Sequence, residues 1–509
     1  MSAITMGDIP REHRRSFPDR LAVIDGKGRQ TWPEFDDRTN RVASMLTDLE
    51  VGAGDRVLWL AQSSVCFLEL LIGCAKVGAM VCPVNWRQSG DELRFVIEDF
   101  APKVIVWQEE EIGAAVVQAR SATLHRATWL QFDGEGEGSF EHAVLSADDS
   151  DLEVGVSPDA PLLVIYTAAI IDRPNGAMLT HRNLLSMGMA TARVTEADHT
   201  SVFLNSGPLF HVGNFQFEAI PVFLHGGTNI FLRRVDAAEV LDLIADERAT
   251  SAFLMPPTIM EIKELNNEAK RDLSSLRSGP FAPFWGDALP PDTTLWGTEP
   301  GGFGQTEVSG LAVLNAYGGK GLGNSGRPSP LVQVRVVDPA GRECAVGQSG
   351  ELVIRGDLVH AGYWNRPELN RQRMRNGWWH TTDLGRREPD GTVHFIGTMT
   401  RMIKSAAENI YPPEVEACLE SHPAVREAAL IGVPDPKYRQ SVKAVVALVD
   451  GATVSEREMI EHCKSRIASY KKPRSVEFVP ALPRRDGVKD YDALDRMFGG
   501  GGYPGGDNV

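Results

Sequence analysis

Cysteine is scarce in this sequence, and none of it stands in a pairing pattern. Only six cysteines occur in 509 residues, no two are spaced as C-x-x-C, and no histidine cluster accompanies them. The pattern therefore favours buried free thiols over a disulfide framework or a zinc site.

Long apolar runs are also absent. The segment 1–17 has no apolar stretch of the kind found in signal peptides, and the most apolar stretch of helix length, 65–80, carries Glu69 and Lys76. That stretch is too short and too charged to span a membrane. We expect a cytoplasmic protein with no membrane span.

Positive charge is in deficit. Lys and Arg number 52 against 68 Asp and Glu, which gives a net charge of −16. An acidic surface disfavours nucleic acid and anionic membranes as main partners, although it leaves room for a local basic site that binds a phosphorylated ligand. Hydrophobic residues make up 42% of the chain and charged residues 24%, a balance that allows a large core and argues against wholesale disorder.

The first part of the chain alternates between strand and helix patterns. Apolar runs predict strands at 21–24, 57–60, 80–84, 103–107 and 158–165, and helical spacing predicts helices around 42–46, 67–77 and 93–100. Strands and helices in alternation are typical of parallel sheets covered by helices. We therefore expect an α/β fold in this part of the chain.

Beyond residue 320 the pattern changes. Segments 333–337, 350–355 and 378–397 predict a β-rich part, and an α+β pattern follows, with helices at 413–421 and 455–469 and strands at 428–433, 443–449 and 475–478. We expect an N-terminal domain at 1–397 and a small C-terminal domain at 398–497. The glycine-rich tail at 498–509 has little to bury and is expected to be disordered.

Six stretches in a fixed order carry information about the family. They are YTAAIIDRPNGAMLTHRNLL at 166–185, PLFHVGN at 208–214, GFGQTE at 302–307, TTDLGR at 381–386, GTMTRMIKSAAENIYPPEVE at 397–416, and the closing segment 470–489 with YKKPR, LPR and a final lysine. In this order they resemble the motifs of the adenylate-forming (ANL) superfamily, which includes acyl-CoA synthetases, luciferases and peptide-synthetase adenylation domains. The resemblance spans about residues 15–495.

The resemblance implies a fold and a reaction. The fold is a large N-terminal domain of several subdomains, with parallel sheets and a β-rich part, followed by a small mobile α+β domain. The reaction has two steps: an acid and ATP give an acyl-adenylate and pyrophosphate, and a thiol then displaces AMP. CoA and acyl-AMP are the implied substrates, and Mg²⁺ is an optional metal.

The stretch that matches the family's phosphate loop departs from its pattern. The family loop is roughly Y-T-S-G-T-T-G-x-P-K-G, in which glycines let backbone N–H groups turn inward, hydroxyls donate to phosphate oxygens and the lysine supplies charge. Here the matching residues are Thr167, Ala168, Ala169, Ile170, Ile171, Asp172, Asn175 and Gly176. Every hydroxyl between Thr167 and Gly176 is missing, an aspartate replaces a glycine, and an asparagine replaces the lysine.

These changes oppose the binding of a triphosphate. A carboxylate about 4 Å from a phosphate charge repels it by about 4 kcal/mol at an effective dielectric of about 20. The loss of one preorganised donor commonly costs about 3 kcal/mol in a transition state. We expect adenylation to be lost or very weak, with a variant loop that holds ATP through its backbone as the alternative.

The residues that match the family's AMP site are intact. By resemblance, Phe303 stacks on adenine, Thr306 reaches the α-phosphate, and Asp383 accepts from both ribose hydroxyls, a role that suits a carboxylate. Glu307 would hold Mg²⁺ if the metal is used. The predicted AMP or acyl-adenylate site comprises Gly286, Asp287, Ala288, Gly302, Phe303, Gly304, Gln305, Thr306, Glu307 and Asp383.

His211 and Lys489 are the candidates for catalysis. His211 resembles the family histidine that lines the carboxylate and acyl pocket, and Phe210, Asn214 and Phe215 are further candidates for that pocket. Lys489 resembles the family lysine that contacts the reacting carboxylate and the α-phosphate. Its setting differs, because valine replaces the preceding glycine and aspartates surround it, so a solvated surface lysine is the alternative.

The hinge between the domains also departs from the family. Thr400 and Arg401 replace the usual hinge residues. Ala406 and Ala407 replace the Gly-Gly pair that flanks the pantetheine tunnel in family ligases. Alanine is small enough to leave a narrow tunnel for CoA.

The losses fall on one half of the reaction. Adenylation must neutralise a triphosphate, whereas thioester formation binds one phosphate, has AMP as leaving group and depends mainly on positioning. The favoured hypothesis is a ligase that converts acyl-AMP and CoA into acyl-CoA and AMP, with acyl-AMP supplied by a separate adenylating enzyme. In this respect the sequence resembles the non-adenylating acyl-CoA ligase type of platensimycin-like natural-product (diterpenoid) biosynthesis. A complete ATP-dependent acid–CoA ligase and a non-catalytic acyl-nucleotide-binding protein are the alternatives.

Overall fold

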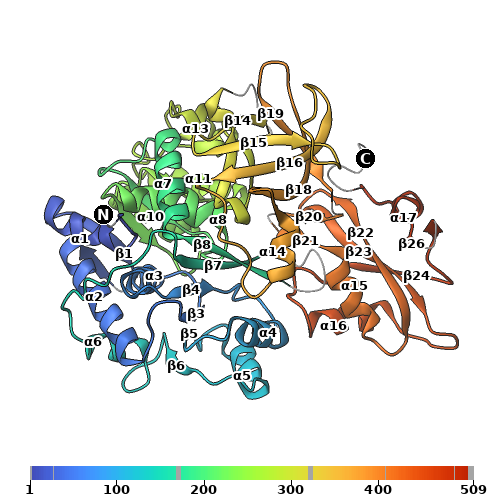
Figure 1. Ribbon diagram of the computed structural model, residues 1–509, viewed down its shortest axis with the longest axis horizontal. Helices are drawn as coiled ribbons and strands as arrows, with labels where there is room; N and C mark the ends of the chain where they lie inside the picture. The colour runs from blue at the N-terminus through green and yellow to red at the C-terminus, as the bar shows by residue number, and fades with distance from the viewer. Residues whose placement is uncertain are drawn as a thin grey trace.

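The computed structural model describes residues 3–26, 28–167, 174–318, 325–399, 401–406, 408–485 and 488–502 (Figure 1). Two mainly parallel sheets and one antiparallel sheet form the N-terminal domain, and a further sheet with its helices forms the C-terminal domain. Figure 1 shows the smaller domain at the right, against one side of the larger one. The predicted α/β fold with a β-rich part and a small C-terminal α+β domain is confirmed.

The central sheet has six strands in the order β6-β5-β3-β4-β7-β8. Neighbouring strands are parallel except for the antiparallel pair β7 and β8. The strand predicted at 158–165 begins only at Pro161, because 158–160 form a turn in which the carbonyl of Pro158 accepts the N–H of Arg182. The strands are β3 (Arg56–Leu60), β4 (Met80–Pro83), β5 (Val104–Trp107), β6 (Thr128–Gln131), β7 (Pro161–Thr167) and β8 (Asn175–Thr180).

The second sheet has the order β11-β9-β10-β1-β2, in which only β2 is antiparallel to its neighbour. Its strands are β1 (Leu21–Asp25), β2 (Gly28–Thr31), β9 (Val202–Asn205), β10 (Thr228–Phe231) and β11 (Ser251–Ala252). Strands from the start and the middle of the chain therefore meet in one sheet.

Helix α3 (Val65–Val77) is buried along its entire length in the N-terminal domain. It carries two charges into the core. Lys76 pairs with Asp36 at 2.6 Å, and Glu69 pairs with Arg38 at 2.8 Å. Both partners belong to α2 (Trp32–Asp48), and such pairing is what allows a charged side chain to be buried.

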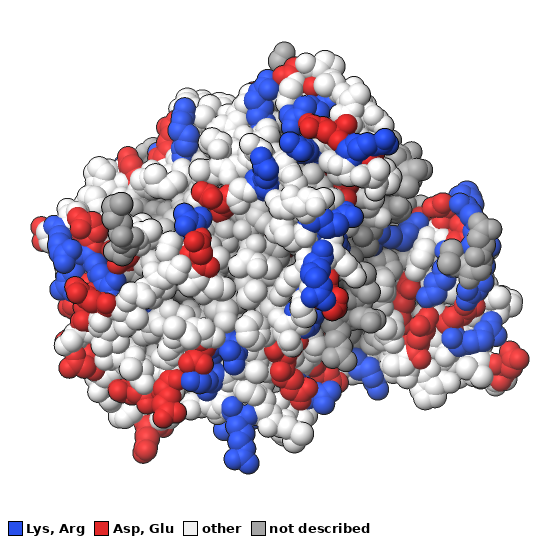
Figure 2. All heavy atoms as spheres, viewed as in Figure 1, with Lys and Arg blue, Asp and Glu red and all other residues white. Residues whose placement is uncertain are grey.

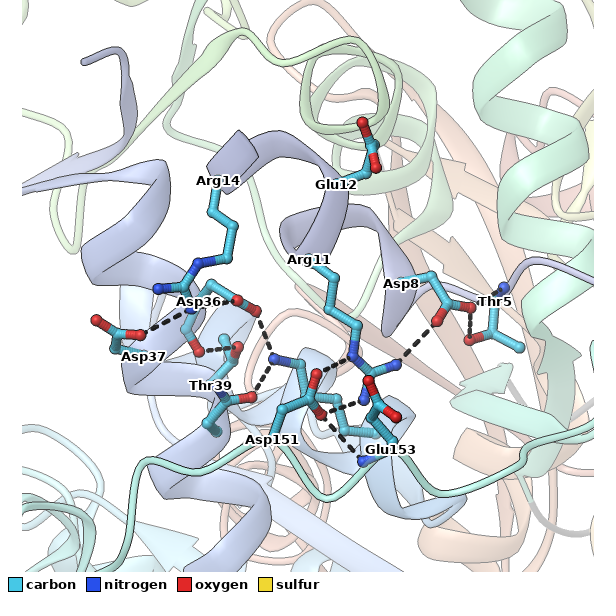
Figure 3. Close-up of polar contacts among 12 residues, drawn as sticks. Thr5, Asp8, Arg11, Glu12, Arg14, Asp36, Asp37, Thr39, Asp151 and Glu153 are labelled. Atoms are coloured by element: carbon cyan, nitrogen blue, oxygen red, sulfur yellow. Dashed lines mark hydrogen bonds and ion pairs between the residues drawn. The ribbon is translucent and has the colours of Figure 1, made fainter. Parts of the chain in front are cut away.

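The same network holds the N-terminal helix α1 (Asp8–Ser16) in place (Figure 3). Arg11 binds Asp151 at 2.5 Å and Asp8 at 2.8 Å, and Arg14 binds Asp36 at 2.8 Å. Figure 3 shows the two arginines leaving one helix toward different carboxylates. The network thus joins α1, α2 and the segment around Asp151.

The β-rich part forms an antiparallel sheet in the order β12-β13-β14-β19-β18-β16-β15, with β17 paired to β18. Its strands are β12 (Gly302–Gln305), β13 (Gly310–Leu314), β14 (Ser325–Pro328), β15 (Val332–Val337), β16 (Ser349–Gly356), β17 (Met374–Arg375), β18 (Trp378–Arg387) and β19 (Val393–Thr398). The predicted strands at 333–337 and 350–355 are confirmed as β15 and β16.

The remaining helices of the N-terminal domain cover the sheets and connect their strands. They include α4 (Gly90–Phe100), α5 (Gly113–Ala122), α6 (Phe140–Leu145), α7 (His181–Thr195), α8 (Val212–Asn214), α9 (Ile220–Leu224), α10 (Ala237–Asp246), α11 (Pro256–Ala269), α12 (Ala282–Trp285), α13 (Leu295–Thr298) and α14 (Pro367–Arg373), together with the π-helical turn η1 (Phe215–Ala219) and the short 3-10 turns η3 (Gly286–Ala288) and η4 (Thr306–Val308). Among the described residues, no helix has both the length and the apolar character needed to cross a membrane.

The C-terminal domain begins after a short linker, since β19 ends at Thr398 and β20 begins at Ile403. Its sheet is built from β20 (Ile403–Ser405), β21 (Glu408–Ile410), β22 (Val425–Asp435), β23 (Arg439–Leu448) and β24 (Ser475–Val479), with helices α15 (Pro412–Glu420), α16 (Glu456–Lys464) and α17 (Tyr491–Phe498) and the hairpin β25 (Arg484–Arg485) and β26 (Val488–Lys489). The helix predicted at 455–469 ends at Lys464.

The start of the glycine-rich tail packs on this domain. The N–H of Gly501 donates to the carbonyl of Gly432 at 2.8 Å, and Gln440 donates to the carbonyl of Gly502 at 3.0 Å. Residues 498–502 of the tail predicted to be disordered therefore have fixed partners, while 503–509 lie outside the described residues.

The cysteines and the surface charges can be compared with the sequence analysis. All six cysteines are free, and only Cys344 is partly exposed. Figure 2 shows acidic and basic side chains interspersed over the visible face, without a field of one sign.

Candidate active site

A cavity of about 560 Å³ opens where the carboxyl ends of the two parallel sheets meet. Its walls follow β3 and β4 in the central sheet and β9 and β10 in the second sheet. Open α/β sheets bind ligands at these strand ends. The predicted pocket residue Phe210 lines this cavity, and Arg87, Arg233 and Arg234 also reach it.

His211 follows Phe210 and caps helix α8. Its Nδ1 accepts the N–H of Gly213 at 3.0 Å, so the neutral imidazole carries its proton on Nε2. Burial lowers the pKa of His211, and the charge of Lys404 lowers it further. The neutral form of His211 therefore carries its proton on Nε2, for which no acceptor is found among the described residues, and the residue is exposed.

The other two predicted pocket residues lie deeper. Phe215 is fully buried, with its ring 5.5 Å from that of Phe67, and it belongs to the main core of the domain. Asn214 is also fully buried and donates to Oδ1 of Asn205 at 2.6 Å. Neither lines the cavity, so core packing explains Phe215 better than contact with an acyl group.

The C-terminal domain reaches this site through the hairpin β20–β21. Glu408 on β21 pairs with Arg87 at 2.8 Å, and Lys404 on β20 is close enough to His211 to shift its pKa. The guanidinium of Arg87 also lies 5.8 Å from the ring centroids of Phe210 and Tyr470. The hairpin therefore borders the space in front of His211.

A second set of contacts holds the two domains together beside the hairpin. Lys471 is almost fully buried and donates to Glu92 at 2.9 Å and to Glu414 at 2.5 Å. Ser89 donates through Oγ to the carbonyl of Arg466 at 2.7 Å. Ser89 and Glu92 open helix α4, so the start of that helix is the docking point for the C-terminal domain.

The predicted hinge and tunnel residues lie next to this hairpin. Ala406 has a φ of 51°, in the left-handed region that favours glycine, and its N–H donates to the carbonyl of Tyr438 at 2.7 Å. Alanine thus adopts the backbone conformation that a glycine would take here. Arg401 pairs with Asp495 at 2.8 Å. Thr400 and Ala407 lie outside the described residues.

Asp383 lies on β18, where Gln305 from β12 donates to its Oδ2 at 2.5 Å. Gln305 also donates to the carbonyl of Thr381 at 3.0 Å, which fixes the amide. Burial raises the pKa of Asp383 to about 7, and the nearby Glu307 acts in the same direction. Two predicted nucleotide residues, Gln305 and Asp383, are therefore in direct contact.

Glu307 is the other carboxylate of this group. Tyr363 donates to its Oε1 at 2.7 Å, and burial raises its pKa. Both carboxylates also raise the pKa of Tyr411, although burial has the larger effect. Tyr411 directly precedes α15, so the C-terminal domain approaches the nucleotide side of the site as well.

The glycine-rich strand β12 is packed too closely for larger residues. A Cβ on Gly304 would come within 1.8 Å of the carbonyl oxygen of Gly310, and one on Gly302 within 2.1 Å of the carbonyl oxygen of Val313. Phe303, between them, stacks on Phe395 with ring centroids 5.0 Å apart. One face of Phe303 is thus covered by protein, and the residue is buried in the antiparallel sheet. Thr306 begins the turn η4 directly after this strand.

The predicted turn at Gly286, Asp287 and Ala288 forms the exposed element η3. Ala288 borders a separate cavity of about 850 Å³ beside helix α11. In the described part of the chain, no hydrogen bond or ring contact joins these residues to Phe303 or Asp383.

Only the two ends of the predicted phosphate loop are described, since Ala168, Ala169, Ile170, Ile171 and Asp172 lie outside the described residues. At the ends, Thr167 donates through Oγ1 to the carbonyl of Asn175 at 3.3 Å. Oδ1 of Asn175 accepts from Nε of Arg366 at 3.1 Å, and Arg366 pairs with Asp99 at 2.8 Å. The side chains at both ends are therefore bound within the protein. Gly176 sits against Val164, where a Cβ would lie 2.9 Å from its side chain.

Two family models match the chain. The model for the AMP-binding enzyme matches residues 10–364, and the model for the AMP-binding enzyme C-terminal domain matches residues 414–487. The chain belongs to the AMP-binding enzyme family. The family assignment confirms the predicted adenylate-forming superfamily and its acyl-CoA ligase branch.

Relatives of this AMP-binding enzyme match over nearly its whole length. Feruloyl-CoA synthase of Amycolatopsis sp is 33% identical over 485 residues, which cover 94% of this chain and 96% of that protein. The solved structure of Mycobacterium tuberculosis fatty acyl CoA synthetase is 28% identical with a TM-score of 0.68, covering 97% of this chain and 98% of that one. o-Succinylbenzoate CoA synthetase of Bacillus subtilis, bound with its product analogue, is 23% identical with a TM-score of 0.80, covering 96% and 98%, and supports the fold.

Lys489 of this AMP-binding enzyme is enclosed in the C-terminal domain. Its Nζ donates to Glu416 at 2.9 Å, to Glu420 at 3.2 Å and to the carbonyl of Ala428 at 2.6 Å. Burial opposes its charge, but the two glutamates outweigh that effect and raise its pKa. Figure 1 shows its strand, β26, at the outer side of the C-terminal domain, away from β18. Three acceptors hold the ammonium, and the side chain is partly exposed.

The family implies a divalent metal, and Glu307 is the residue to test for it. Among the described residues, no group of three or more His, Cys, Asp or Glu side chains is arranged to hold a metal ion. Glu307 offers a single carboxylate with one oxygen bound to Tyr363. Mg²⁺ commonly uses one or two carboxylates and completes its shell with phosphate and water, so this chain can supply one ligand to a nucleotide-bound ion.

Several residues of the site were not predicted from the sequence. Arg366 binds Asn175, Tyr363 donates to Glu307, and Arg87 joins the cavity to the C-terminal domain. Each lies far in sequence from its partner. The only available signal is the position of Arg87 shortly after strand β4, where ligand-binding residues of parallel sheets are found.

Proposed function

We propose that this AMP-binding enzyme is an acyl-CoA ligase that works mainly in the second half-reaction, in which acyl-AMP and CoA give acyl-CoA, AMP and a proton. The observation that carries the proposal is the sequence of the phosphate loop, together with the contacts at its two ends. Its sequence has lost the donors and the lysine, and the side chains of Thr167 and Asn175 at its ends are already bound to the protein. Between Thr167 and Gly176 the sequence offers a triphosphate no hydroxyl and no lysine.

The position of Lys489 supports the same conclusion. For the lysine to act on a carboxylate and an α-phosphate, its ammonium must leave Glu416, Glu420 and the carbonyl of Ala428. Each such hydrogen bond to a charged group is worth about 1.5–3 kcal/mol. Adenylation therefore carries an added cost that thioester formation does not share.

The second half-reaction needs groups that remain. Gln305 and Asp383, which match the family's nucleotide motifs, are in direct contact, and the neutral form of His211 carries its proton on Nε2. We assign His211 as the donor to the acyl carbonyl oxygen, where negative charge develops as the thiolate sulfur attacks. The bond to AMP then breaks, and AMP leaves with its phosphate charge.

The cavity lined by Phe210 is the site that we assign to the phosphates of CoA. Arg87, Arg233 and Arg234 all border it. In the structure Arg87 pairs with Glu408, and both Arg233 and Arg234 pair with Glu110. Phosphate oxygens bind arginine through charge-assisted hydrogen bonds and would compete with these carboxylates.

One experiment separates the candidate functions. In one tube the protein receives an acid, ATP and CoA, and in the other the synthetic adenylate of the same acid and CoA. Ferulate, indoleacetate and decanoate serve as probe acids, because relatives are named for aryl, indolyl and fatty acyl ligation. Acyl-CoA only in the second tube supports the proposal, since the adenylate must then come from a separate enzyme.

Product in both tubes would instead identify a complete acid–CoA ligase. The guanidinium of Arg366 beside Asn175 is the observation that favours this second function, because it offers positive charge at the base of the loop. Product in neither tube with every probe, together with tight binding of an acyl-adenylate, would identify a non-catalytic binder.

A further inference from the structure

The helix that follows His211 contains an irregular turn. Between α8 and α9 lies the π-helical turn η1, in which the N–H of Ile220 donates to the carbonyl of Phe215, five residues earlier. Such turns are rare and frequently mark functional sites. Glu218 lies in this turn, seven residues beyond His211, or about 10 Å along a helix axis.

Glu218 is the acidic residue of this turn. Its surface is only partly covered by protein, yet burial raises its pKa to about 7, and nearby Asp292 raises it further. Both facts hold when a side chain faces a hollow that bulk water does not fill. Gly213, five residues earlier, is exposed, and a Cβ there would lie 2.9 Å from the ring of His211, so the start of this helix packs directly against the histidine.

The carboxyl of Glu218 has no hydrogen-bond or ion-pair partner among the described residues, and it is not alone in this. In the same part of the chain, Nε2 and Oε1 of the fully buried Gln216 and the buried Nε1 of Trp296 also lack partners. Trp296 packs against Phe217, with ring centroids 4.5 Å apart, so it belongs to the surroundings of the same turn. Buried polar groups are almost always paired, so several unpaired ones around one turn point to a partner from outside the protein.

We propose that Glu218 selects acyl groups that carry an oxygen function, a ketone or a hydroxyl, roughly 10 Å from the reacting carbonyl. The inference rests on the proposed acyl-CoA ligase function. The carboxyl donates its proton to a ketone oxygen or accepts one from a hydroxyl. A plain hydrocarbon chain leaves the carboxyl unpaired, and the site rejects it for that reason.

Three acyl-adenylates of equal length test the inference with CoA as acceptor: those of decanoate and of its ketone and hydroxyl derivatives at the penultimate carbon. The native enzyme should prefer one or both oxygenated probes over decanoyl-AMP by about tenfold in kcat/KM, the worth of one hydrogen bond. Glu218→Leu should abolish this preference, and Glu218→Gln, which keeps a donor and an acceptor, should retain part of it. Glu239→Leu, an exposed carboxylate lost from α10, should leave the preference unchanged.

Two outcomes would overturn the inference. One is an equal kcat/KM for all three probes in the native enzyme, and the other is an unchanged preference in Glu218→Leu. Adenosine binding by each variant checks that the nucleotide side is folded. If the native enzyme converts none of the probes, nor the adenylates of ferulate and indoleacetate, the proposed function itself has failed, which is distinct from a loss of selectivity alone.

Discussion

Lys471 of the C-terminal domain donates to Glu92 of the N-terminal domain at 2.9 Å, with its side chain almost fully buried. A buried charge pair between two domains favours the arrangement in which the pair forms. When the domains separate, both charged groups lose that partner. The arrangement that the pair favours brings the β20–β21 hairpin to Arg87 and His211 and keeps Lys489 within its own domain. The docking contact and the chemistry of the second half-reaction are therefore linked.

Weakening this contact should loosen the docking. Glu92→Gln leaves Lys471 with Glu414 as its remaining charged partner and removes about 1–3 kcal/mol from the interface. We expect cleavage in the linker after β19 to be about tenfold faster in limited proteolysis and the KM for CoA to rise. Asp91→Asn, an exposed neighbour on α4, is the matched control. Equal cleavage rates in the two variants would argue against the docking role.

The charge of Asp383 should control nucleoside binding near neutral pH. Its pKa is raised to about 7 by burial, and ribose hydroxyls donate to the ionised form. Adenosine, which has no phosphate to titrate, should therefore bind about tenfold more tightly at pH 8 than at pH 6. Calorimetry on Asp383→Asn should give weak binding with no such slope. A slope that persists in that variant would assign the titration to another group.

The same raised pKa should make the folded protein less stable as pH rises, whereas nucleoside binding becomes tighter. A carboxyl whose folded pKa lies above its unfolded value near 4 stabilises the fold when protonated. The contribution is complete below about pH 4 and is lost as pH rises to about 7. Thermal unfolding of the nucleotide-free protein should show a smaller decline over this range in Asp383→Asn than in the native chain.

Thr382 should be a strained residue. Its φ is 59°, in the left-handed region that a β-branched side chain rarely adopts. Thr382→Gly should raise the free energy of unfolding by about 1 kcal/mol, even after the greater freedom of glycine in the unfolded chain is counted. Differential scanning calorimetry measures the change. Thr381→Gly, at a neighbour with an ordinary φ whose hydroxyl bonds the carbonyl of Leu352, should destabilise instead.

Lys489 should be dispensable for thioester formation. Lys489→Met removes the cation from Glu416, so the C-terminal domain should lose about 1–3 kcal/mol of stability. The rate of acyl-CoA formation from acyl-AMP should change by less than about twofold at temperatures where the variant is folded. A large loss of rate from preformed acyl-AMP, without unfolding, would mean that the lysine serves the second half-reaction.

The strands and helices of the large domain followed from local patterns, because buried parallel strands and their covering helices have strong apolar periods. The order of the motifs sufficed to group Gln305, Glu307 and Asp383 in one site. Partners distant in the chain did not follow: the glutamates around Lys489 lie about 70 residues before it, and Asp36 pairs with Lys76 from another helix. No local pattern predicts such pairs, since either carboxylate alone is typical of an exposed helix face.

The acyl side was the hardest to predict. Phe215 is of a residue type that often lines acyl pockets, but it packs against Phe67 in the core. Glu218 is of a residue type that is usually exposed, but it lies in the π-helical turn η1, where it is partly buried. The extra residue of a π-helical turn shifts every later side chain around the helix axis, and no sequence pattern predicts this shift.

ATP–pyrophosphate exchange measures directly whether formation of the acyl-adenylate by this enzyme is lost or very weak. The acid to use is the one whose synthetic adenylate the enzyme converts fastest to acyl-CoA. With that acid, ATP, Mg²⁺ and labelled pyrophosphate, we expect no exchange above the acid-free background. Acid-dependent exchange at a rate comparable to thioester formation would contradict it.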